Sequence, residues 1–199
     1  MKKFRMFLIV YFLLFNLFSF AQNENELSRH RHVNEFVQEL LSKKIDTFCD
    51  YEVFTEKTEA MYTQYLFWND QGKTKVKKLE LNHNYSVIEI NADEIWQYLL
   101  TNREKIKTED VKFFSILKNG QIQDVISQGN YFREFNLLVN SEVIKFWTSS
   151  FDFQKNDRLD GKKVENVYFE HNNNLKGKFA LDQLENFLKK LERQKAFKD

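Results

Sequence analysis

Residues 63–81, TQYLFWNDQGKTKVKKLEL, decide the class of fold that the sequence predicts. Their pattern has a period of two and is rich in aromatic and β-branched residues, as is typical of strands. Between the two arms lies Gly72, which tolerates the positive φ that a tight turn demands. The stretch therefore predicts an antiparallel hairpin, and the period of two extends over residues 51–90.

A second hairpin is predicted in residues 111–127, VKFFSILKNGQIQDVIS. Its centre is Asn119-Gly120, a dipeptide that favours the type I′ turn, whose twist matches that of the flanking strands. More strand-like sequence follows in NYFREFNLLV (130–139) and EVIKFWTSSFDF (142–153). Antiparallel pairing should therefore build most of the sheet.

Three amphipathic helices accompany these strands. Their apolar residues recur at three- and four-residue steps. Asn91 is the expected N-cap of the middle helix, with Glu94 at the capping-box position. The apolar stripes are Val33, Phe36, Val37, Leu40, Leu41, Ile45 and Phe48; Ile95, Tyr98, Leu99 and Ile106; and Leu181, Leu184, Phe187, Leu188 and Leu191. The predicted fold class is α+β, with antiparallel hairpins forming one curved sheet, or two small ones, packed with three helices.

Two stretches resemble each other. GKTKVKKLELNHN (72–84) aligns with GKKVENVYFEHN (161–172) if one residue is skipped, which places His83 opposite His171. The similarity continues into the helix that follows each stretch. It suggests an internal duplication of a β-turn-β-α unit; the alternative is convergence, because glycine turns and amphipathic segments use similar residues.

The first 21 residues have the organisation of a secretory signal peptide. A basic start, MKKFR, precedes an apolar run at 6–20, and small residues at Ser19 and Ala21 suit cleavage after Ala21. The stretch resembles signal peptides of exported proteins of Gram-negative bacteria. A retained membrane anchor is the alternative, but the run is short for a spanning helix. We expect residues 1–21 to be removed and 22–199 to form a single α+β domain, periplasmic or extracellular, with no membrane span.

Charge argues against nucleic acid as a partner. The whole chain has a net charge of +1, and removal of Lys2, Lys3 and Arg5 leaves 27 basic against 29 acidic side chains. A chain with a net charge of −2 lacks the excess of positive charge that binds phosphates. Cys49 is the only cysteine, so no disulfide can form within the chain. We expect Cys49 to be a buried residue at the end of the first helix; intermolecular pairing or a nucleophilic role is the alternative.

Two histidines are the candidate metal ligands. His83 and His171 are each expected where a core-facing row of a strand meets solvent. If the strand ends converge, the two imidazoles and a carboxylate from Asp70, Asp160 or Glu170 would bind a divalent metal. Otherwise each histidine bonds to nearby backbone. No other cofactor is expected, because nucleophile-elbow, zinc-helix, C-x-x-C and phosphate-loop motifs are all missing from the sequence.

Aromatic residues give the best indication of binding. The strands at 131–153 carry bulky residues on both faces. Either both faces are buried, or one of them exposes an apolar strip to a partner or ligand. Phe132, Phe146, Trp147 and Phe151 are the candidate ligand-binding residues. The leading hypothesis is a non-catalytic envelope module that binds a partner protein or an apolar ligand. The alternative is a hydrolase or metal-dependent enzyme that uses His83 and His171.

Overall fold

The computed structural model describes residues 34–55, 63–80, 83–127 and 131–198. The signal peptide predicted at residues 1–21 lies outside these residues. Contacts divide the chain into residues 1–43 and 44–199, and each part is described by itself. In the first part, residues 34–42 form a helix in which Phe36 and Leu40 are buried and Leu41 is exposed.

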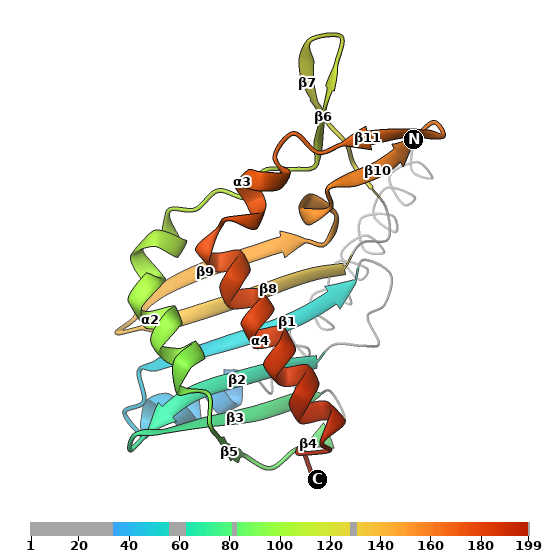
Figure 1. Cartoon of the computed structure of the whole chain (residues 1–199). Helices are drawn as coiled ribbons and strands as arrows, with labels where there is room; N and C mark the ends of the chain where they lie inside the picture. The colour runs from blue at the N-terminus through green and yellow to red at the C-terminus, as the bar shows by residue number, and fades with distance from the viewer. Residues whose placement is uncertain (1–33, 56–62, 81–82, 128–130, 199) are drawn as a thin grey trace, which may run out of the picture. The chain divides into compact units, whose positions relative to one another are not determined.

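The second part is α+β, as predicted, and is built on a large antiparallel sheet (Figure 1). The strands run in the order β4-β3-β2-β1-β8-β9, and β5 pairs with β3 as well. Their bounds are β1 Thr47–Thr55, β2 Thr63–Asp70, β3 Lys73–Glu80, β4 His83–Asn84, β5 Ile88–Ile90, β8 Tyr131–Val139 and β9 Glu142–Ser149. The central strand β1 pairs with β2 on one side and with β8 on the other.

Two smaller hairpins form separate two-stranded sheets. β6 (Ser115–Lys118) pairs with β7 (Gln121–Asp124), and β10 (Asn156–Leu159) pairs with β11 (Lys162–Glu165). Asn119 and Gly120 have φ values of 53° and 76°, so the predicted type I′ turn is confirmed. The same pair of positive φ values occurs in the turns from β2 to β3, β8 to β9 and β10 to β11.

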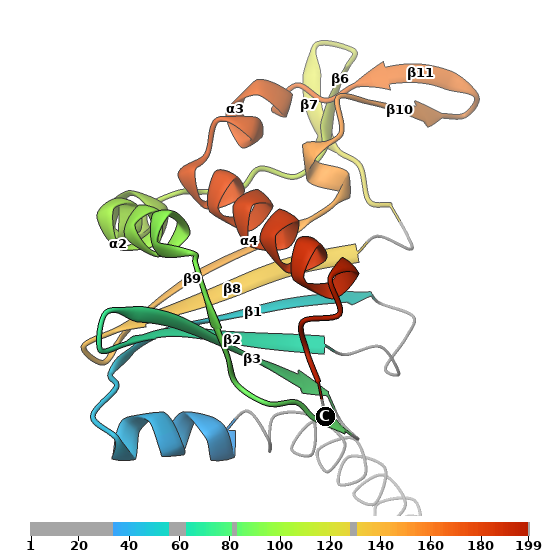
Figure 2. The ribbon, with the colours of Figure 1, turned by 60° about the horizontal axis from the view of Figure 1, so that its bottom comes forward.

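Two long helices cover one face of the large sheet (Figure 2). They are α2 (Asp93–Lys107) and α4 (Lys176–Arg193). Leu99 and Ile106 of α2 are buried, and so are Leu181, Leu184, Leu188 and Leu191 of α4, which confirms most of the predicted stripes. They meet core residues of the sheet that include Tyr51, Phe67, Phe135, Leu137 and Phe146.

A smaller core holds the hairpins to the end of the sheet. Phe114, just before β6, stacks on Phe151 of the short 3-10 helix η1 (Phe151–Phe153), with 4.4 Å between ring centroids. The fully buried Asn172 of α3 (Phe169–Asn173) accepts a bond from the Lys112 N–H and donates to the carbonyl oxygens of Lys112 and Asp152. The Asn172 side chain thereby satisfies three backbone groups of the connecting segments, two in Lys112 and one in Asp152.

Three local predictions were wrong. The first helix ends at Ser42, because Lys44 adopts a positive φ and Phe48 and Cys49 belong to the central strand β1. The predicted strand through His171 stops at Glu165 and gives way to α3. The N-cap of α2 is Ala92, which makes no side-chain cap bond, rather than Asn91. Consequently the two similar stretches share a hairpin turn but continue differently.

Among the described residues, no helix combines the length and the apolar character that crossing a membrane requires.

Candidate functional site

The two faces of the large sheet differ in chemistry. Successive side chains of a strand point to opposite faces, so the residues that alternate with the core residues lie on the face away from α2 and α4. We call this the distal face. It carries Phe48, Asp50, Glu52 and Phe54 of β1, Gln64, Leu66 and Trp68 of β2, Phe132, Glu134, Asn136 and Leu138 of β8, and Lys145 and Trp147 of β9.

A row of polar residues crosses the distal face. In the strand register Trp147 is opposite Glu134, Glu134 is opposite Glu52, and Glu52 is opposite Gln64. Directly paired side chains on one face lie about 5 Å apart at their β-carbons. Glu52, Gln64 and Glu134 are buried, whereas Trp147 is 46% exposed. The row therefore leads from an exposed indole ring into a buried set of hydrogen-bond acceptors.

A neighbouring row supplies the hydrogen bonds that hold these acids in place. Asp50 Oδ1 accepts bonds from the backbone N–H and the side-chain amide of Asn136, at 3.2 and 2.9 Å. The Asn136 amide also donates to Glu134 Oε1 at 2.9 Å. Burial raises the pKa of Asp50, and the nearby charge of Glu134 raises it further, against the hydrogen bonds that lower it. Two carboxyl groups are thus held close together by one amide.

One acceptor in the row has no partner among the described residues. Gln64 is only 3% exposed, and no described residue donates a hydrogen bond to its Oε1 atom. The side chain also bonds to Asp50, which it reaches from the adjacent strand. Because Asp50 accepts hydrogen bonds when it is ionised, the Gln64 amide N–H is the donor and Oε1 is left for another donor. A buried carbonyl oxygen without a donor costs free energy unless a ligand or water provides one.

Aromatic rings adjoin the row at the exposed end. Phe54 and Phe132 stack with 5.3 Å between ring centroids, and Phe132 and Trp147 lie 6.3 Å apart with a tilt of 38°. Lys145, two residues before Trp147 on the same face, places its Nζ 2.8 Å from Glu134 Oε2. We call Phe54, Phe132, Trp147, Glu52 and Glu134 the aromatic–carboxylate patch. It combines ring surfaces with carboxylates, which suits a ligand that is both flat and cationic.

The structure separates the four aromatic residues that the sequence singles out. Phe132 and Trp147 lie together in the aromatic–carboxylate patch. Phe146 points to the other face, where it stacks on Phe135 in the main core, and Phe151 lies in the small core with Phe114. The residues 146 and 147 differ because adjacent positions of a strand face opposite ways.

The two candidate histidines lie at opposite edges of the large sheet. His83 is in β4 at one edge, where its Nδ1 is 3.8 Å from Glu80 Oε2. His171 is in α3, which packs beside η1 beyond the other edge strand, and its Nε2 is 2.9 Å from the carbonyl oxygen of Asp110. Asp70 pairs with Lys75, Asp160 lies in a hairpin turn and Glu170 in α3. Within the described ranges, no group of three or more His, Cys, Asp or Glu side chains could hold a metal.

Cys49 is fully buried in the main core. Burial raises the pKa of its thiol well above the ordinary value, and the charge of Asp50 adds to that effect. A thiol with a raised pKa stays protonated and is a poor nucleophile. Cys49 therefore acts as a small packing residue of β1.

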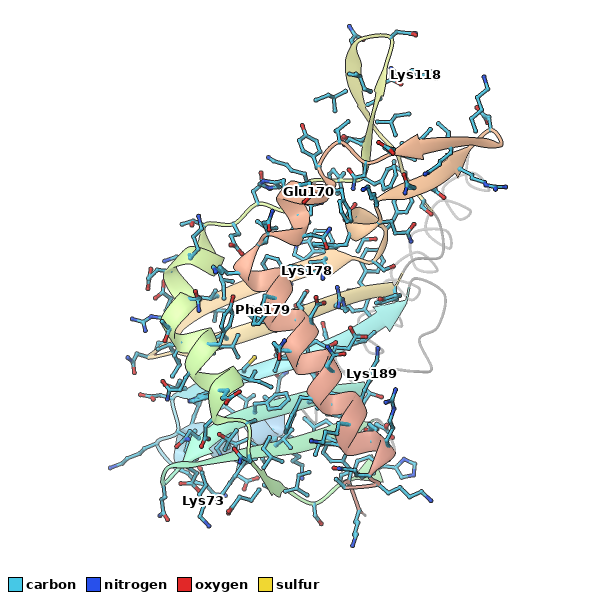
Figure 3. The ribbon with its side chains drawn as sticks, in the orientation of Figure 1. Lys73, Lys118, Glu170, Lys178, Phe179 and Lys189 are labelled. Atoms are coloured by element: carbon cyan, nitrogen blue, oxygen red, sulfur yellow. The ribbon has the colours of Figure 1, made fainter. Side chains whose placement is uncertain are left out.

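A charged network on the helix-covered face fixes α4 to the sheet. Arg133 Nη1 donates to Asp182 Oδ1 at 2.9 Å and to Glu185 Oε2 at 2.8 Å. Lys178 and Lys189, labelled on α4 in Figure 3, pair with the same two carboxylates. Every charge in this network has an opposite neighbour, which suits a structural role better than a site for a ligand.

An open groove of about 550 Å³ lies between the two small hairpins. Its lining includes Ile116, Leu117, Val164 and Val167, with Lys118 toward the end of the protruding β6–β7 hairpin (Figure 3). Leu117 and its cross-strand neighbour Ile122 are exposed. The groove shares no residue with the aromatic–carboxylate patch.

Sequence reasoning did not single out Glu52, Gln64 or Glu134. They come from three strands separated by up to 82 positions, and only the pairing of β2, β1 and β8 aligns them. The available signal was local: Glu134 and Asn136 share the parity of Phe132, so a strand with one apolar face would carry polar residues beside that ring.

Comparisons of the chain with protein-family models, curated proteins and solved structures found no match.

Proposed function

We propose that this protein is an exported, non-catalytic binding module that contacts a partner protein through the aromatic–carboxylate patch. The observation that carries the proposal is the position of Trp147, which is about half exposed and lies next to Phe132 and opposite Glu134. Tryptophan is enriched among the residues that dominate the energy of protein interfaces, because one rigid side chain buries a large area at low entropic cost.

A protein partner suits the patch better than an apolar small molecule. Small-molecule sites are concave and enclose most of the ligand. Here Trp147 and Lys145 project from neighbouring positions of the strand β9, at 46% and 54% exposure, and the rings spread over a sheet surface. Carboxylates beside the rings also favour a partner with polar and charged groups over a purely apolar molecule.

The alternative, a hydrolase or metal-dependent enzyme using His83 and His171, would need both imidazoles at one substrate or ion. Their places in β4 and α3, at opposite edges of the sheet, argue against it.

Export rests on the signal-peptide pattern of residues 1–21, and the proposed location is the periplasm or the exterior of a Gram-negative cell. Intact mass spectrometry of protein purified from its native host tests this. We expect a species that begins at Gln22. A mass that includes Met1, in protein that fractionates with the membrane, would refute removal of the leader.

Site-specific photo-crosslinking in native cells tests the docking surface. The photoreactive residue p-benzoylphenylalanine replaces Trp147 in one variant and Phe179 in a matched control. Phe179 is an aromatic residue of α4 with nearly the same exposure, 48%, on the other side of the domain (Figure 3). We expect one discrete adduct from position 147 and none from 179. Adducts at both positions, or at neither, would refute a specific surface at the patch.

A further inference from the structure

We propose that the free edge of β11 pairs with the same edge of a second copy of this chain, so that two β10–β11 hairpins form one four-stranded antiparallel sheet. The inference goes beyond the proposed function and is independent of the aromatic–carboxylate patch, with which the hairpin shares no residue. It follows from three features of the hairpin: an unpaired backbone edge, an open groove beside that edge, and a self-complementary order of charges along it.

The edge of β11 that faces away from β10 carries unpaired backbone groups. β11 pairs with β10 on one side only. Directly after β11, the Asn166 N–H donates to the carbonyl oxygen of Lys155 at 3.0 Å, so the Asn166 N–H points toward the β10 side. Backbone groups alternate in direction along an antiparallel strand, so those of Lys163 and Glu165 point away from β10. No described residue bonds to them there, and an edge of this kind is a template for another strand.

The groove of about 550 Å³ lies along this edge. Its lining includes Lys163, Val164 and Glu165 in succession, together with Ile116 and Leu117 of β6. Successive side chains of a strand point to opposite faces, so a groove lined by all three β11 residues runs beside the edge of the strand and not over one face. The free edge of β11 is therefore open, with space beside it for another strand.

The charges along the edge complement themselves about Val164. If Val164 lies opposite Val164 of the partner subunit, antiparallel pairing sets Lys163 opposite the partner subunit's Glu165, and Glu165 opposite the partner subunit's Lys163. Each of these opposed pairs would exchange both of its backbone hydrogen bonds, and opposite charges directly across strengthen strand pairing. Neither Lys163 nor Glu165 forms an ion pair with another described residue. A second copy thus supplies what both the backbone and the side chains of this edge lack.

The same charges disfavour the neighbouring registers. Moving the two-fold axis by one residue sets either Lys163 opposite Lys163 or Glu165 opposite Glu165, and like charges directly across destabilise strand pairing. The edge therefore specifies one register with its own copy. This self-complementarity favours a second copy over an unrelated peptide as the strand that pairs here.

Sedimentation velocity of the purified protein tests the pairing. Because β11 has only 4 residues, the dimer should be weak, and its fraction should rise with protein over a roughly hundredfold range of concentration. Lys163→Glu and Glu165→Lys should each weaken dimerisation roughly 10- to 100-fold, since each change sets like charges opposite each other at both symmetry-related places.

A mixture of the two charge variants is the decisive control. In the mixed dimer each charge at positions 163 and 165 again faces an opposite charge, so the two variants should dimerise with each other more tightly than either does alone. The double variant Lys163→Glu/Glu165→Lys should dimerise like the parent for the same reason. Recovery by mixing also shows that both single variants are folded.

A disulfide between copies tests the register. Val164 should lie directly opposite its own copy, so Val164→Cys should give a disulfide-linked dimer on oxidation. Arg158→Cys is the control that should stay monomeric, because Arg158 is exposed but belongs to β10, away from the free edge. The native Cys49 is fully buried and does not compete.

A parent protein that stays monomeric at every concentration would overturn the inference. Charge variants that fail to dimerise when mixed would overturn it too, and so would equal disulfide formation by Val164→Cys and Arg158→Cys. The crosslink from position 147 tests the aromatic–carboxylate patch separately, so either proposal can fail while the other stands.

Discussion

Replacing Gly177 with alanine tests how tightly α4 packs on the sheet. Gly177 lies in the first turn of α4 against the ring of Phe146. A β-carbon on Gly177 would come within 2.5 Å of Phe146 Cγ and still closer to Cδ2 and Cε2. Favourable carbon contacts are about 3.5–4.0 Å, so the ring or the helix would have to move by about 1 Å.

Neither partner can move easily. Phe146 is buried and stacks on Phe135 at 5.9 Å. The start of α4 is held by Glu109, whose two carboxylate oxygens accept the N–H groups of Lys176 and Gly177 at 2.7 and 2.8 Å. Alanine is favoured over glycine in a helix by about 1 kcal/mol, whereas overpacking costs about 1–3 kcal/mol. With both sides fixed we expect the upper end of that cost, and a net loss of about 2 kcal/mol in the free energy of unfolding.

Urea denaturation followed by tryptophan fluorescence measures the effect. The midpoint should fall while the slope stays unchanged, because the surface exposed on unfolding is the same. Combining Gly177→Ala with Phe146→Leu should cost less than the sum of the two single changes, since the smaller side chain makes room for the methyl group. If Gly177→Ala is as stable as the parent or more so, helix propensity alone governs the site and the packing argument is wrong.

Three other changes have defined expectations. Asn172→Ala removes three hydrogen bonds to buried backbone and should lower the free energy of unfolding by about 2–4 kcal/mol in denaturant melts. The control Asn173→Ala loses one bond within the helix and should lower it by under about 1 kcal/mol. Equal losses would refute the linking role of Asn172. Arg133→Met should lower the free energy of unfolding by about 2 kcal/mol, because Asp182 and Glu185 each lose a partner. The loss is limited because both carboxylates keep their lysine partners. No loss would show that the Arg133 pairs contribute nothing to stability. The folded state raises the pKa of Asp50, so ionisation of this carboxyl destabilises the fold. The loss of stability is absent below the ordinary pKa of 3.8, grows as pH rises, and is complete above the pKa of the folded state. The stability of Asp50→Asn relative to the parent should therefore rise between acidic and neutral pH, and a constant difference would contradict the raised pKa.

The regular elements of this fold could be predicted because local chemistry determines them. Asn119-Gly120 and Gly72 fit type I′ turns, and the observed φ values follow. The stripe of α4 recurs at helical spacing along its whole length, so tertiary contacts only confirm what the sequence already favours. These were the places where turn chemistry, propensity and burial agree.

The errors arose where tertiary contacts override a local pattern. Phe48 fits the helical spacing of the first helix, yet it occupies the central strand because β1 pairs along both edges. Phe169 and His171 alternate as in a strand, but Asn166 bonds to the N–H groups of Ser115 and Tyr168, and the chain turns into α3. A local sequence window contains neither partner strands nor the side chain of a residue 51 positions away.

Only part of the candidate site could be predicted from the sequence, for the same reason. The aromatic content of residues 131–153 indicated a binding surface, and Phe132 and Trp147 lie together in the patch that we propose as the docking surface. Strand parity could separate Trp147 from Phe146, but it could not say which face α2 and α4 would cover. Glu52 and Gln64 became part of the site only through the register of β8, β1 and β2. Cross-strand register is a property of the whole sheet, and a one-residue slip would move every side chain to the other face.

The polar row across the distal face is costly for folding. Glu52, Gln64 and Glu134 are buried side by side, with Asp50 in the next row, where apolar residues of similar size would be neutral or stabilising. The network on the other face differs, because there Arg133, Lys178 and Lys189 neutralise the acids of α4. On the distal face the exposed Lys145 is the cation paired with Glu134, and no described residue donates a hydrogen bond to Gln64 Oε1. A buried acceptor without a donor costs free energy, so Gln64 Oε1 is the position in the row where a bound donor would stabilise the fold.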